Sequence, residues 1–361
     1  IITYNYLSLE RSSQSCYKPL LRQLLVTSGS QVQLQSPTYR RSMLPRLLAM
    51  AALLRLASSF KPSTLGTNGF LTLSSSLVAA SSPTSCSLRR SSSSWTHLMM
   101  SKSAGSLEVA QFPCLDDNYG YLIHDPKTGE TAALDTPCAS TYARELEKRG
   151  WKLTHILCTH HHGDHVGGNR KLKTDGVKVY GPAADGRIPC MDVPLQSGDT
   201  FSFGGADAVV MDVGGHTLGH IAYHFPEEKT AFVGDSLFSL GCGRMFEGTP
   251  EQFWATLQRL RDLPDDTTIY CAHEYTESNA RFAMSVEPGN PELVRRTEEI
   301  MAKRARGEPT VPSLMGEEKA TNPFLRGDVS EEIRKSVGAS DQEDGASIFY
   351  KIRLGKDSFR G

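Results

Sequence analysis

The first 105 residues almost lack acidic side chains. They contain eleven Lys and Arg but a single acid, Glu10, together with 24 serines. A segment that is rich in Arg and Ser and poor in acids is typical of an organelle transit peptide. The whole 361-residue chain has a formal net charge of −1, so residues 106–361 carry a net charge of −11. An acidic body argues against an enzyme that follows a nucleic-acid backbone, because phosphate binding needs clustered Lys and Arg.

The chain also lacks a long uninterrupted apolar run. Its best candidate follows Met43, where Arg46 and Arg55 interrupt a basic, amphipathic stretch that is too short to span a bilayer. We therefore expect no stable membrane association, and we expect residues 1–105 to be a leader that directs the protein to the mitochondrion. The plastid is the alternative destination. A solvated disordered tail and a secretory signal peptide are the competing interpretations of the same residues.

Extreme composition is absent as well. With 39% hydrophobic and 22% charged residues, 31 glycines and 19 prolines, the chain is neither a collagen, nor a coiled coil, nor disordered throughout. Short apolar or alternating runs after residue 106 predict strands. These runs lie at residues 107–112, 119–123, 131–135, 153–158, 177–180, 208–213, 221–224, 231–233 and 268–271. Interspersed helices make the expected class α/β, with two sheets and helices outside them.

Capping signals predict the helices. Residues 140–149 form a helical run that ends at Gly150, and Thr249-Pro250-Glu251-Gln252 combines an N-cap, a first-turn proline and a capping-box glutamine. Asn290-Pro291 starts a further helix, and Ser330 starts what we expect to be the last one. We therefore predict an α/β domain over 106–275 and a smaller helical domain over 276–361.

One segment combines metal-binding side chains at close spacing. The sequence Thr159-His160-His161-His162-Gly163-Asp164-His165 directly follows an apolar strand, so it forms a loop at a strand end. Neutral imidazoles bind zinc or iron, and a carboxylate adds charge and can orient water. A purification tag or a loose chelating tract is the alternative, but the Asp and the preceding strand favour a built metal site.

This segment resembles the His-x-His-x-Asp-His signature of the metallo-β-lactamase superfamily. The superfamily's later motifs resemble three further segments, Gly215–His220, Gly234-Asp235-Ser236 and Ala272-His273-Glu274-Tyr275. The resemblance implies an αββα sandwich with a C-terminal helical domain and metals at one sheet edge. It also implies a ligand set with His160, His162 and His216 on one ion, Asp164, His165 and His273 on a second, and Asp235 bridging both.

That ligand set implies two divalent metal ions per chain, with zinc expected and iron or manganese as alternatives. Asp164 and Asp235 then act in catalysis together with a hydroxide that bridges the metals. His161, His220 and His224 have no ligand role in this scheme, and we expect them to be hydrogen-bonding residues.

Four further segments are similar to the glyoxalase II, or hydroxyacylglutathione hydrolase, family. They are Asp117-Asn118-Tyr119, Gly241-Cys242-Gly243-Arg244, Cys271–Tyr275, and a C-terminal part with Asn322-Pro323-Phe324-Leu325-Arg326 and Arg353–Phe359. The resemblance covers residues 107–361. It implies hydrolysis of the thioester S-D-lactoylglutathione to D-lactate and glutathione, in methylglyoxal detoxification, by a monomer. The leaving thiolate has a parent pKa near ~8.5, so no strong general acid is required.

The same resemblance implies a glutathione pocket. It places Arg353 and Lys356 near the glycyl carboxylate and Arg244 and Tyr275 in the same pocket, whereas solvated surface charge is the alternative role for the first two. Some family members carry Tyr where this chain has Phe246, which can pack against the substrate but cannot donate a hydrogen bond. We expect Cys242 to be structural, because the metals already supply a nucleophile.

Three other functions compete with this one. A persulfide dioxygenase of the same superfamily acts on glutathione persulfide with a single iron bound by two His and one Asp, and it needs neither the second metal site nor the helical domain. A nuclease is disfavoured by the acidic charge balance. A non-catalytic binding module would be expected to have lost ligands, and all seven are present.

Overall fold

The computed structural model describes residues 99–102 and 107–361. The predicted leader and the segment after Met43 lie outside these residues, except that Met99–Lys102 form strand β1. The further strands are β2 (Glu108–Cys114), β3 (Asn118–His124), β4 (Thr131–Leu134), β5 (His155–Leu157), β6 (Lys178–Pro182), β7 (Val193–Leu195), β8 (Thr200–Phe203), β9 (Ala206–Asp212), β10 (Ile221–Phe225), β11 (Thr230–Gly234), β12 (Leu237–Phe238), β13 (Gly241–Cys242), β14 (Thr268–Cys271) and β15 (Ser313–Leu314). The helices are α3 (Ala139–Arg149), α4 (Gly163–Val166), α5 (Asn169–Leu172), α6 (Pro250–Arg261), α7 (Thr276–Val286), α8 (Pro291–Ala305), α9 (Met315–Thr321), α10 (Pro323–Arg326), α11 (Glu331–Ser336) and α12 (Gly345–Ser358).

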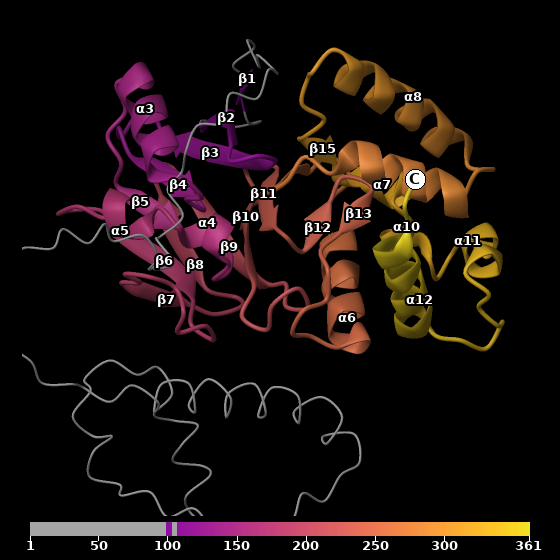
Figure 1. The fold of residues 1–361 in the computed structure, drawn as a ribbon. Coiled ribbons are helices and arrows are strands. Elements are labelled where there is room, and N and C mark those ends of the chain that lie inside the picture. Colours follow the sequence, from indigo (N-terminus) through magenta and orange to yellow (C-terminus); the bar gives the residue numbers. More distant parts are fainter. Residues whose placement is uncertain (1–98, 103–106) are drawn as a thin grey trace, which may run out of the picture. The chain divides into compact units, whose positions relative to one another are not determined.

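The strands form two mixed sheets and a small hairpin. The first sheet has the order β1-β2-β3-β4-β5-β6-β7, the second has the order β15-β14-β11-β10-β9-β8, and β12 pairs with β13 alone. Strands β4 to β7 run parallel to one another, whereas β8 to β11 are antiparallel. Helices α3 and α5 lie beside the first sheet, and the helices from α6 onward lie on the other side of the strands (Figure 1).

Large apolar side chains fill the space between the sheets. Tyr121, Phe203, Tyr223 and Phe232 are almost fully buried in one continuous cluster that also contains side chains of α6 and α12. A second cluster lies under α3, where Tyr142 packs edge-on against Phe112 at 5.0 Å between ring centroids. The predicted α/β sandwich with a helical C-terminal part is confirmed.

The capping signals are also confirmed. The Thr249 hydroxyl accepts a hydrogen bond from the Gln252 backbone, the Gln252 side-chain oxygen accepts one from the Thr249 backbone, and α6 begins at Pro250. The Asn290 side chain caps α8 by accepting from the backbone N–H groups of Glu292 and Leu293. The expectation that the helix after Ser330 is the last one is wrong, because α11 ends at Ser336 and α12 follows, capped by Asp344. No helix among the described residues combines the length and apolar character that a membrane crossing requires.

Candidate metal centre

The seven predicted ligands come from the ends of strands in both sheets. His160 and His162 follow β5, and Asp164 and His165 lie on the short helix α4 directly after them. His216 follows β9, and the remaining two ligands, Asp235 and His273, follow the parallel neighbours β11 and β14. Because these strand ends meet at one edge of the sandwich, residues more than 100 positions apart in the chain come within contact distance.

The first cluster consists of three imidazoles. His160 Nε2 and His216 Nε2 each lie 3.0 Å from His162 Nδ1. His160 and His216 are buried, whereas His162 is partly exposed. The three ring nitrogens therefore converge on one point, with His162 on the open side.

Asp235 connects this cluster to a second one. The second cluster contains Asp164, His165 and His273, and His273 Nε2 lies 3.4 Å from Asp164 Oδ2. Asp235 Oδ1 lies 3.4 Å from His165 Nε2 and 3.5 Å from His273 Nε2, while Asp235 Oδ2 lies 3.4 Å from His216 Nε2. One carboxylate thus directs one oxygen to each cluster.

The residues fit a pair of metal ions. His165 Nε2 and Asp235 Oδ1 are buried and have no hydrogen-bond partner in the described part of the chain. A buried polar atom without a partner costs about 1–3 kcal/mol, so two such atoms facing one point indicate a missing positive partner. The donor set, imidazole nitrogen and carboxylate oxygen, is the set that zinc, iron and manganese accept. The clusters therefore define a binuclear metal site.

In the buried ligand rings, the nitrogen that faces away from the ligand clusters, here called the outer nitrogen, forms a hydrogen bond with an oxygen atom of the protein. His165 Nδ1 donates to Asp135 Oδ2 and His273 Nδ1 donates to Asp117 Oδ1, both at 2.8 Å. His216 Nδ1 donates to the Arg244 carbonyl, also at 2.8 Å. A donor hydrogen bond from the outer nitrogen leaves the inner nitrogen free to bind a metal and fixes the ring orientation. These hydrogen bonds therefore hold the three ligand rings in the orientation that metal binding requires.

Charge and burial act on the same groups. Burial opposes the charge of Asp235, but the neighbouring His165 and His273 hold the pKa of its carboxyl well below its usual range. Burial also opposes the charge of His273, and Asp235, Asp117 and Asp164 nevertheless raise its pKa to about 9. By contrast, burial lowers the pKa of His160. The first cluster therefore presents neutral imidazoles, the form that binds metal.

Sequence reasoning missed the role of Asp135. Its carboxylate accepts hydrogen bonds from the Thr159 backbone and hydroxyl, at 2.8 Å each, in addition to the bond from His165. Asp135 lies directly after β4 and has a φ of +46°. The position of an acid directly after an apolar strand could have marked Asp135 as a candidate. Its partner His165 lies 30 residues further along the chain, so the contact could not be read from the local sequence.

His220 supports the site without lying among the ligands. Its Nε2 accepts a hydrogen bond from the Asp235 backbone at 3.0 Å, and its ring stacks on His160 at 4.6 Å. A side chain at Gly234, which has a φ of +53°, would lie 2.7 Å from the His220 ring, so only glycine fits between strand β11 and this ring. His161 faces away from the ligand clusters, 2.7 Å from Asp185.

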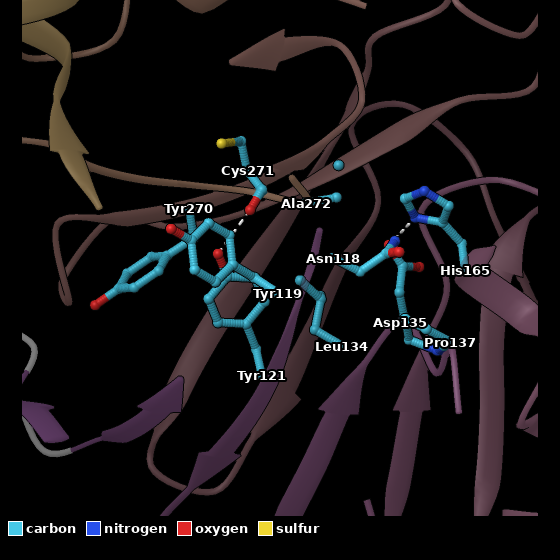
Figure 2. Close-up of a pocket in the computed structure, with 11 residues that line it drawn as sticks. Asn118, Tyr119, Tyr121, Leu134, Asp135, Pro137, His165, Tyr270, Cys271 and Ala272 are labelled. Atoms are coloured by element: carbon cyan, nitrogen blue, oxygen red, sulfur yellow. Dashed lines mark hydrogen bonds and ion pairs between the residues drawn. The ribbon is translucent and has the colours of Figure 1, made fainter. Parts of the chain in front are cut away.

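A small cavity borders His165. Asn118, Asp135, Tyr119 and Tyr121 contribute to its lining (Figure 2). The Tyr121 hydroxyl donates to the Cys271 carbonyl at 2.6 Å, next to this cavity. Tyrosine rings and hydrogen-bonded backbone therefore line this cavity.

The predicted substrate residues differ in their exposure and in what they contact. Tyr275 stacks on His273 with 4.8 Å between ring centroids, and Phe246, which is 61% exposed, lies 5.2 Å from the His216 ring. Arg353 is buried and donates to the Cys242 carbonyl at 2.9 Å, and its Nε has no hydrogen-bond partner among residues 99–102 and 107–361. Lys356 Nζ donates to the Ser278 carbonyl at 2.9 Å.

Arg244, Arg353 and Lys356 form a cationic cluster. Arg244 and Arg353 each lie within reach of a single acid, Asp357, at 3.6 Å and 3.1 Å. Burial and the charges of the two arginines lower the pKa of Lys356 to about 8. Because three cations lie near one another and only Asp357 pairs with two of them, the cluster is suited to bind an additional anion.

Comparisons with known proteins agree with this geometry. The family model described as the metallo-beta-lactamase superfamily matches residues 118–273, and the one described as hydroxyacylglutathione hydrolase C-terminus matches residues 274–359. The hydroxyacylglutathione hydrolase of Erythrobacter litoralis (strain HTCC2594) is 52% identical over 254 residues, covering 70% of this chain and 100% of its own. That of Methylococcus capsulatus (strain ATCC 33009 / NCIMB 11132 / Bath) is 52% identical over 257 residues, covering 71% and 100%.

Among solved structures, the crystal structure of ETHE1 from Myxococcus xanthus is 24% identical. It covers 69% of this chain and 97% of its own, with a TM-score of 0.48.

The two sheets and the His and Asp clusters at their shared edge, together with the match over residues 118–273, define a metallo-β-lactamase fold. With the helical C-terminal match and relatives about half identical over their full length, the chain belongs to the hydroxyacylglutathione hydrolase family.

Proposed function

We propose that the protein hydrolyses S-D-lactoylglutathione to D-lactate and glutathione, as part of methylglyoxal detoxification, at a centre that holds two divalent metal ions. Zinc is the first candidate, and iron and manganese suit the same donors. The observation that carries the proposal is Asp235, whose two oxygens face the two ligand clusters separately. The names of the relatives supply the substrate class.

The proposed ligands divide as their geometry suggests. His160, His162 and His216 would hold one ion, and Asp164, His165 and His273 the other, with Asp235 shared. Bound there, the two ions would lower the pKa of a water molecule toward neutrality and polarise the thioester carbonyl. The chain itself holds the rings in place through Asp135, Asp117 and the Arg244 carbonyl.

The open side of the site determines how the substrate lies. His162 and Asp164 are the partly exposed ligands, so we propose that the thioester approaches past them. Phe246 and Tyr275 flank this side, and their rings pack against the peptide part of glutathione. Burial raises the pKa of the Tyr275 hydroxyl, which stays protonated and can donate a hydrogen bond to the substrate.

The cationic cluster gives the proposal its specificity. Arg244 and Arg353 share one carboxylate and lower the pKa of the nearby Lys356, so we assign the three cations to the glycyl carboxylate of glutathione. A charge-assisted contact of this kind contributes about 1.5–3 kcal/mol to binding. We also propose that the protein acts as a monomer, because every proposed ligand comes from one chain.

Steady-state kinetics on two thioesters tests the function. The metal-loaded chain should hydrolyse S-D-lactoylglutathione, and it should have a higher KM for the same lactoyl thioester of N-acetylcysteine, which lacks the glycine. Oxygen uptake with glutathione persulfide is the parallel assay for the dioxygenase alternative. Oxygen uptake without thioester hydrolysis would replace the proposed function by that alternative.

A further inference from the structure

The hairpin β12–β13 lies between two parts of the metal centre. It begins two residues after Asp235 and ends two residues before Arg244, and its turn consists of Ser239 and Leu240. All residues from Asp235 to Gly243 are buried. The polar backbone groups of such a buried turn need partners, because each group left without one costs free energy.

Side chains of the C-terminal helices supply those partners. The Asn322 amide donates to the carbonyls of Phe238 and Gly241, at 3.1 Å and 3.0 Å, and thereby joins the two strands of the hairpin. Glu318 on α9 accepts from the Leu240 backbone at 2.9 Å. Asn322 is the first residue of the Asn-Pro-Phe-Leu-Arg motif, so the motif has a structural target in the catalytic part of the chain.

A buried ion pair completes the network. Arg296 on α8 pairs with Glu318, and it also donates to the Ser239 hydroxyl at 2.9 Å. Asn279 on α7 donates to the Ser239 carbonyl at 3.1 Å. The exposed fractions of Arg296 and Glu318 are 6% and 0%. A buried ion pair contributes little net stability, and its best-supported role is to enforce one geometry.

The end of the hairpin touches the first metal cluster directly. A Cβ at Gly243 would lie 2.0 Å from the Asp235 carbonyl oxygen and 2.9 Å from His216 Nδ1, so the backbone runs against both residues. The next carbonyl, that of Arg244, accepts the hydrogen bond that orients His216. A displacement of the hairpin therefore moves the oxygen that fixes the His216 ring.

We propose that Glu318, Arg296, Asn322 and Asn279 are positioning residues for the metal centre. They hold the β12–β13 hairpin in the one arrangement that aligns Asp235 and His216 for metal binding. The helical C-terminal part thus sets the geometry of the metal site in addition to contacting substrate. This inference rests on the proposed two-metal site, but it needs no assumption about the substrate.

A matched control separates positioning from general stabilisation. Glu287 at the end of α7 is 3% exposed and pairs with Arg326, but it makes no hydrogen bond to the hairpin. Glu287→Gln therefore weakens a partly buried ion pair of the same helical part. Glu318→Gln weakens the pair that holds the hairpin.

Cobalt titration of the metal-free full-length chain is the test. We expect Glu318→Gln to bind Co²⁺ about ten- to a hundredfold more weakly than wild type and to change the visible spectrum of the bound ion, as the loss of an outer partner of a ligand typically does. Glu287→Gln should lower the melting temperature and leave the Co²⁺ affinity and spectrum unchanged.

Asn279→Ala is the second variant, because it keeps the ion pair and removes only the donor to Ser239. It decides the question if Glu318→Gln does not fold, and it should also weaken Co²⁺ binding. Wild-type affinity and spectrum in both variants, or in Asn279→Ala alone when the other variant does not fold, would overturn the proposal. Because no substrate is used, an inactive wild-type protein would count against the proposed function and leave this comparison intact.

Discussion

Each buried ligand ring carries two hydrogen-bonding nitrogens, and the structure assigns them opposite tasks. The outer nitrogen donates to an oxygen of the protein, and the inner nitrogen points to the proposed metal. The spacing of His160, His162, Asp164 and His165 made these residues predictable from the sequence. Asp135 was not, because its role depends on the contact between β4 and α4, which no local pattern encodes.

Asp135→Asn tests the orientation of His165. The amide keeps the shape of the side chain but loses the charge that favours the required ring orientation. We expect metal affinity to fall about ten- to a hundredfold, measured by competition with a chelator. Asp185→Asn is the control, since Asp185 faces His161, which has no ligand role. Equal metal affinities in the two variants would show that the Asp135 contact does not orient a ligand.

Lys356 gives substrate binding a pH dependence. Its pKa of about 8 means that the ammonium group loses its proton as the pH rises through that value. Only the protonated form attracts the glycyl carboxylate, so KM for S-D-lactoylglutathione should rise above pH 8. Lys356→Ala should raise KM by roughly ten- to a hundredfold at neutral pH, which corresponds to about 1.5–3 kcal/mol, and remove this dependence.

The lactoyl thioester of N-acetylcysteine, which lacks glycine, is the control for Lys356. Its KM should be the same for the wild-type protein and for Lys356→Ala. A parental KM for S-D-lactoylglutathione in Lys356→Ala would identify Lys356 as surface charge.

At the scale of the elements, local signals predicted nine buried strands and four of the helices, whereas α7 and several short elements were not predicted individually. The capping box at Thr249 and the cap at Asn290 mark helix starts, and the apolar runs mark the buried strands. Helix α12 was missed, although Asp344 is a good N-cap, because residues 345–358 mix glycine with branched side chains. Helix α4 was missed because it has four residues and no side-chain cap, so its conformation depends on tertiary contacts.

The capping box of α6 has a measurable contribution to stability. Thr249→Ala removes the acceptor for the Gln252 backbone. The free energy of unfolding should fall by about 1 kcal/mol, as in other N-cap substitutions, and urea denaturation measures the change. Thr249→Ser keeps the hydroxyl and should lose much less. If both variants unfold at the wild-type urea concentration, the cap does not contribute.

At the scale of the whole molecule, charge separates the chain into two parts. Residues 1–105 have eleven basic residues and one acid, and the remainder carries a net charge of −11. We propose that the basic part directs import into the mitochondrion, or alternatively the plastid, and that catalysis does not need it. A fluorescent fusion of residues 1–105 should enter the organelle. A diffuse cytosolic signal from that fusion would argue against this role.

The dependence of thioester hydrolysis on bound metal tests the central claim most directly. Metal-free protein is titrated with Zn²⁺, and the rate of S-D-lactoylglutathione hydrolysis is measured against the number of ions bound per chain. The two clusters joined by Asp235 predict no hydrolysis without metal and a rate that increases until two ions are bound. Turnover by the metal-free protein, or no turnover with both ions bound, would contradict the account.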